Sequence, residues 1–144
     1  MNKDFLSRLS TDKHGSALVE FALLAPIVFG MFFGIIQLGI SMQAQNSLRG
    51  IASDTARWAV VEYMKQNEVN DDAIKAKAVA IATSTPYSLK NTVTVTITPV
   101  ATPRIHGTFE KKIKIDYTPP NVMPFFNFTS RQQSFERPIF LLDE

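Results

Sequence analysis

A long apolar stretch near the N-terminus constrains the fold more than any other feature of the chain. Between Phe21 and Ile40 no side chain is charged, and Gln37 is the only plainly polar one. Twenty residues of α-helix rise about 30 Å, the thickness of the hydrocarbon core of a bilayer. The strongly apolar residues of the stretch together favour insertion by roughly 4 to 7 kcal/mol. We therefore predict a transmembrane helix over residues 16–40. A soluble core is disfavoured, because so short a chain cannot cover a helix that is apolar on all sides.

Composition removes several classes of function. The 144 residues contain no cysteine, which excludes disulfide frameworks, thiolate catalysis and cysteine-based metal sites. The net charge of +2 is spread along the chain, so we expect no nucleic-acid partner. The two histidines, His14 and His106, form no catalytic or metal-ligand spacing, and no phosphate-binding loop is present. We expect no enzyme, no catalytic residue, no cofactor and no metal.

The segment before the apolar stretch is not a conventional signal peptide. Residues 1–15 contain three basic residues and two aspartates but no apolar core of their own. The basic residues Lys3, Arg8 and Lys13 favour a cytoplasmic N-terminus, with Arg49 and Arg57 opposing them on the other side. This predicts a single-pass protein of the inner membrane with a periplasmic C-terminal part.

Glu20 stands at the edge of the apolar stretch, where a charged side chain is costly. One interpretation is that its carboxylate simply reaches the lipid headgroups. The other comes from the order Gly15-Ser16-Ala17-Leu18-Val19-Glu20-Phe21, which resembles the processing site of type IV pilin-like precursors. This resemblance implies that a prepilin peptidase removes residues 1–15 by cutting between Gly15 and Ser16, and that the helix is retained. Cleavage would create an ammonium on Ser16, which needs a counter-ion in apolar surroundings. The resemblance implies that Glu20, followed by Phe21, pairs with this group between neighbouring subunits.

A more specific resemblance covers residues 15–39. The glycine, the Glu20-Phe21 pair, the following Ala22-Leu23 and a proline inside the helix are similar to TadE-type pseudopilins of the tight-adherence (Tad, or Flp) pilus. Ser16 departs from the Phe or Met usual in the type IVa and type II secretion groups. The segments 115–120 and 124–126 resemble a Tyr/Pro-rich patch of the same family. The family implies four kinds of partner: prepilin peptidase, other pilin subunits, the Tad inner-membrane assembly platform and the lipid bilayer.

Small or flat residues recur every four positions within the apolar stretch. Ala22, Pro26, Gly30 and Gly34 would form one narrow stripe on a helix, and Gly30 and Gly34 make a GxxxG motif. Such a stripe permits close helix packing in membranes. Glycine and proline are also common in transmembrane helices for other reasons. Pro26 is expected to kink the helix.

The remaining residues predict an α+β head. Apolar residues at three- and four-residue spacing predict that the helix continues amphipathically over residues 41–66, with Gly39 and Gly50 as candidate breaks and Trp58 in the core. Residues 67–144 predict a head with a helix over 71–83 capped by Asn70. Alternating segments at 93–98 and 109–117 predict an antiparallel strand pair, and 132–140 a third, edge strand carrying Phe135 and Phe140. The expected fold is pilin-like.

Together these features predict a processed minor pilin or pseudopilin of a Tad-type pilus, acting in pilus assembly, adhesion or secretion. An uncleaved, single-pass, membrane-anchored binding or adhesin module is the alternative. Whether the protein enters the fibre or only primes its assembly stays open at this point.

Overall fold

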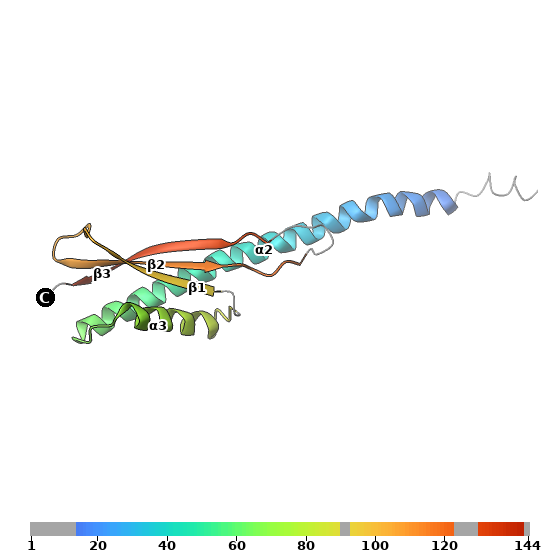
Figure 1. Cartoon of the computed structure of the whole chain (residues 1–144). Helices are drawn as coiled ribbons and strands as arrows, with labels where there is room; N and C mark the ends of the chain where they lie inside the picture. The colour runs from blue at the N-terminus through green and yellow to red at the C-terminus, as the bar shows by residue number, and fades with distance from the viewer. Residues whose placement is uncertain (1–13, 90–92, 123–129, 143–144) are drawn as a thin grey trace, which may run out of the picture.

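The protein is a long helix with a small head packed against its C-terminal half (Figure 1). The computed structural model describes residues 14–89, 93–122 and 130–142. The elements are α2 (His14–Met64), α3 (Asp71–Thr83), β1 (Val93–Val100), β2 (Thr108–Tyr117) and β3 (Gln133–Leu142). This arrangement confirms the predicted α+β class, a long helix with a small antiparallel sheet.

Helix α2 runs without a break through Pro26, Gly39 and Gly50 over 51 residues. Its N-terminal part is apolar enough to cross a membrane, and the most apolar window is 0% buried within the chain. Burial begins at Ala44 and is complete at Leu48. One helix therefore has two environments, an exposed apolar half and a half that forms the floor of the head.

Helix α3 lies antiparallel to the end of α2. Asn70 caps it, since its side-chain oxygen accepts a hydrogen bond of 2.7 Å from the Ala73 amide, and Asp71 and Asp72 occupy the positive first turn. Contacts with α2 fix the direction of α3. Tyr87, just after α3, bonds Asp54, whereas Lys77 lies over the ring of Trp58 one turn further along α2. The predicted helix and cap are confirmed.

The sheet is fully antiparallel in the order β1-β2-β3, so β2 is central. Its inner face packs on the helices through Val95, Ile113, Ile115, Ile139 and Leu141, all nearly inaccessible to solvent. The helices supply the rest of the core, mainly Leu48, Ile51, Ala52, Ile74 and Ala78. The outer face carries threonines and ion pairs such as Lys112–Glu136 at 3.2 Å.

One strand end needs correction. β1 does not end before Pro99, because it continues to Val100 and a proline is tolerated on an edge strand. Phe109, near the start of β2, lines a hollow at the end of the sheet and is 49% exposed. The third strand is confirmed as an edge strand, displaced to Gln133–Leu142.

At Gly50, the turn that follows α3 approaches α2 closely through Tyr87. A Cβ at Gly50 would lie 2.4 Å from the Tyr87 hydroxyl and 2.7 Å from its ring. The ring is held there because the hydroxyl donates a 2.8 Å hydrogen bond to Asp54. Burial, with Asp54 beside it, raises the pKa of Tyr87. Gly50 is thus required for packing rather than for helix bending.

We expect Gly50→Ala to destabilise the head. Overpacking costs roughly 1 to 3 kcal/mol, and the better helix propensity of alanine returns about 1 kcal/mol. The net loss should appear as a lower midpoint of chemical unfolding for the detergent-solubilised full chain. Gly39→Ala is the matched control, because a Cβ there meets no atom within 4 Å. A Gly50→Ala variant as stable as the Gly39→Ala variant would contradict this assignment.

Candidate functional site: the exposed half of helix α2

The predicted processing site lies in the first turns of α2. The helix begins at His14, and residues 15–20 are all exposed. The Ser16 hydroxyl donates a 3.2 Å hydrogen bond to the Glu20 carboxylate, one helical turn away. The structure therefore brings Ser16 and Glu20 together on one face. Phe21 is also exposed, at 69%.

The small-residue stripe is open along its length. Ala22 and Pro26 are exposed, while Gly30 and Gly34 are partly covered by the side chains around them. A Cβ added at Gly34 would meet nothing within 4 Å, so the head does not require this glycine. The stripe is available to lipid or to another helix.

Gln37 connects the apolar half to the head. Its side-chain nitrogen donates to the Pro120 carbonyl at 3.3 Å, and its side-chain oxygen accepts from the Val122 amide at 3.0 Å. Pro119, next in this loop, is buried, and its carbonyl accepts a 2.5 Å hydrogen bond from Ser130. Both functional groups of one amide thus bind a loop 83 to 85 residues away in sequence. The proline patch of residues 115–120 is located here, against α2, while residues 124–126 lie outside the described part.

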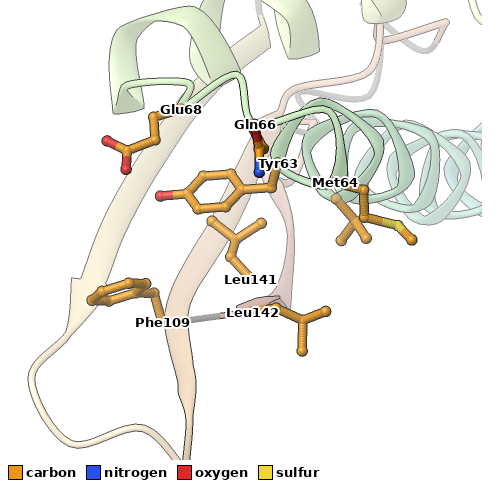
Figure 2. A pocket seen from close by; sticks show the side chains of 8 residues that line it. Tyr63, Met64, Gln66, Glu68, Phe109, Leu141 and Leu142 are labelled. Atoms are coloured by element: carbon orange, nitrogen blue, oxygen red, sulfur yellow. The ribbon is translucent and has the colours of Figure 1, made fainter. Parts of the chain in front are cut away.

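A second feature, an apolar hollow, lies at the far end of the head (Figure 2). Its volume is about 290 Å³, and it is lined by Val60, Tyr63, Met64, Gln66, Glu68, Phe109, Leu141 and Leu142. The aromatic rings of Tyr63 and Phe109 and the side chain of Leu141 converge on it, with Glu68 on the rim. Glu68 has no polar partner among the described side chains, and no acid–base pair is assembled. The hollow offers contact surface rather than chemistry.

The loop between β1 and β2 is fixed by an ion pair on the outer sheet face. Glu110 accepts hydrogen bonds from the Arg104 amide and guanidinium at 2.6 to 2.9 Å. The Arg104 hydrogen bonds hold the pKa of Glu110 below its ordinary value. The guanidinium also lies 5.4 Å from the ring centre of Phe140, which faces this outer side. This cluster orders the loop and leaves Glu110 buried and fully paired.

Gly15, Ser16, Glu20 and Phe21 stay a predicted processing and pairing site, whereas sequence reasoning missed the contacts of Gln37 with the distant loop. The signal was present, because a single amide in a stretch of apolar residues needs a polar partner. The partner could not be found, since it lies in a distant loop. Within residues 14–89, 93–122 and 130–142, no group of three or more His, Asp or Glu side chains could hold a metal ion.

Comparison with known proteins agrees with this geometry. Residues 15–57 match the family model described as TadE-like protein. No curated protein and no solved structure shows a significant match to the chain. The predicted resemblance is therefore confirmed and extends past residue 39 into the part of α2 that carries the head. This likeness suggests an association with Tad pilus systems and covers less than half of the chain.

Proposed function

We propose that this protein is a minor pilin or pseudopilin of a Tad-type pilus, cleaved by prepilin peptidase between Gly15 and Ser16. One observation carries the proposal: a single unbroken helix joins the Gly15–Glu20 site, an exposed apolar half and the folded head. Cutting at the start of this helix leaves both the anchor and the head intact. The mature chain is then a rod with an apolar N-terminal half, suited to lateral assembly with other helices.

The proposed membrane position follows from Gln37. Irregular backbone facing lipid does not occur within the hydrocarbon layer, so the loop bound at Gln37 lies outside it. Counting back about 20 residues for a 30 Å core places the span at roughly residues 17–36. This span ends about one turn before the end of the expected 16–40 and begins at nearly the same residue. Glu20 lies inside it, about one turn from its start, which makes a positive partner for the carboxylate valuable.

We place the N-terminus in the cytoplasm and the head in the periplasm, anchored by one span. The prepilin peptidase, the assembly platform and other pilin subunits are the proposed partners. The head supplies the contact surface in assembly, adhesion or secretion. The uncleaved anchored module is the competing proposal, and it would use the distal hollow to bind a ligand on its own.

Deletion of the gene for this protein in a cell with a working Tad system tests the proposed function. We expect pili to be lost or reduced in electron micrographs, and restored by the wild-type chain. A chain whose residues 1–15 cannot be removed should fail to restore them. Normal piliation without the protein, or full restoration by an uncleavable chain, would favour the anchored binding module.

Gln37→Leu should loosen the head from the membrane end of α2. The substitution removes both hydrogen bonds between α2 and the loop, one exposed and one part-buried, at a cost of roughly 0.5 to 1.5 kcal/mol each. Because the chain has no cysteine, an Asn121→Cys thiol reports on this loop directly. We expect a membrane-impermeant maleimide to label it faster in the Gln37→Leu background. Gln43→Leu, at an exposed position of α2 beyond the loop, is the control. Equal labelling rates in the Gln37→Leu and Gln43→Leu backgrounds would contradict the proposal that Gln37 holds this loop against α2.

A further inference from the structure

The head has two lateral edges of different character. β3 lies over α2 at one edge, whereas β1 lies beside α3 at the other, with α2 and α3 packed against each other between them (Figure 1). Copies that stand side by side in one membrane, in the same orientation, bring the α2/β3 edge of one copy to the α3 edge of the next. The charges on these two edges therefore decide whether neighbouring copies attract each other.

The α2/β3 edge is a basic groove. Its walls are Arg57 and Val61 from α2 and Arg137 and Phe140 from β3, around an apolar floor that includes Val60. Arg137 donates a 2.9 Å hydrogen bond to Ser53. Arg57 is exposed and has no polar or charged partner among the described residues. No carboxylate is among the residues that line the groove, so neither guanidinium group has a carboxylate partner within the described part of the chain.

The opposite edge is acidic at its distal end. The turn from α2 into α3 carries Glu62, Glu68, Asp71 and Asp72, with Lys65 as the one basic residue over 62–72. Glu62 is bonded to Lys65 and Asn67, and Asp71 to Lys111. Hydrogen bonds from Asn67 and Lys65 lower the pKa of Glu62. Glu68 and Asp72 are exposed and have no such partner among the described residues.

We infer that the basic α2/β3 groove of one copy docks the acidic α2–α3 turn of a second copy. Arginine and carboxylate match in charge and in bidentate geometry. Docking also buries the apolar floor of the groove, which is exposed to water in a single copy. Because the two surfaces are different, the contact is heterologous, and its repetition gives an open array instead of a closed dimer. The inference deepens the proposed function. It rests on that function in one respect, namely that copies stand side by side in the same orientation.

The geometry also sets a displacement between the copies. Lys77 lies beside Trp58, and Asp72 precedes Lys77 by five residues in an antiparallel helix. Asp72 is therefore about 7 to 9 Å further from the membrane end than Arg57. When Asp72 of the second copy binds Arg57 of the first, the second copy is displaced along the α2 axis by about this offset. The length of the two side chains reduces the displacement. A contact with a constant shift is the repeating step of a filament.

Thiol cross-linking in membranes tests the inference, because the natural chain has no cysteine. Two differently tagged full-length copies are expressed together, one with Ser53→Cys in the groove, one turn before Arg57, and one with Ala76→Cys, exposed one turn after Asp72. Because α3 is antiparallel to α2, docking of Asp72 on Arg57 brings these two positions level, and a short bismaleimide should give the mixed dimer. Thr96→Cys, on the outer sheet face, replaces Ser53→Cys in the matched control and should give at least tenfold less product.

Charge reversal then identifies the contact. Arg57→Glu in the groove copy should reduce the mixed dimer at least fivefold, and Glu68→Arg with Asp72→Arg in the other copy should restore it. Arg57 has no partner within its own described chain, so its reversal does not threaten folding. Cross-linking that is equal at Thr96→Cys, unaffected by Arg57→Glu, or dependent on a different pilin subunit would overturn the inference. The mass of each copy, read from the same gel, reports leader removal separately, so failure of processing and failure of docking are distinguishable.

Discussion

Gly15→Ala is expected to leave residues 1–15 attached to the protein. The bond between Gly15 and Ser16 lies in the first turn of α2, and a peptidase must unwind that turn to reach it. Alanine makes the helical form more stable by about 1 kcal/mol and places a methyl group where an enzyme approaches the backbone. We expect the cleaved fraction to fall at least tenfold, which corresponds to about 1.4 kcal/mol in the barrier. The cleaved fraction is measured from the electrophoretic mobility of the membrane protein in cells that contain the peptidase.

The structure supplies a clean control for this variant. A Cβ at Gly15 meets no atom of the chain within 4 Å, and the same is true at Gly34. Neither substitution disturbs the fold, so a difference between them reports on recognition by the peptidase. Gly34→Ala should be processed normally. Equal processing of both variants would remove Gly15 from the site.

Glu20→Gln should be cleaved normally but should not assemble. The amide keeps the size of the side chain and removes its charge. In the pairing that we propose, the ammonium of Ser16 in the neighbouring subunit then loses its counter-ion. Removing one partner of a buried ion pair costs roughly 3 to 5 kcal/mol. We expect more than a tenfold loss of pili counted in electron micrographs, with the variant still present in the membrane. Insertion itself should be easier, because a charge has been removed from the apolar layer.

Glu20→Asp is the matched variant, since it keeps the charge on a shorter side chain. It should restore a large share of the pili. Normal pili from Glu20→Gln would mean that the carboxylate only reaches the headgroups, which is the simpler interpretation of its position. The 3.2 Å hydrogen bond from Ser16 would then be a local feature of the helix end.

Much of the fold follows from local patterns in the sequence. The period of α3, its Asn70 cap and the alternation of Ile113 and Ile115 in β2 act within a few residues, and the structure confirms them. The continuity of α2 through Gly39 and Gly50 needed tertiary information. Gly50 looked like a break because its function is to admit Tyr87, a residue 37 positions later that no local pattern connects to it.

The site divides in the same way. Gly15, Ser16, Glu20 and Phe21 lie within seven residues of each other and were proposed from the resemblance of this segment to pilin precursors. Gln37 was noted as an isolated polar residue, but its two partners lie in a loop more than 80 residues away. The basic groove was missed for the same reason, because Arg57 and Arg137 meet only after β3 is placed on α2. Residues that act across elements require the packed structure.

Intact-mass spectrometry of the full protein extracted from membranes tests the central claim most directly. With prepilin peptidase present, the account predicts a chain that begins at Ser16, still carries the whole of residues 16–40 and partitions with the membrane. Without the peptidase, the mass should correspond to the uncut chain. A chain that keeps Met1 when the peptidase is active, or a soluble chain that has lost the apolar half of α2, would contradict it.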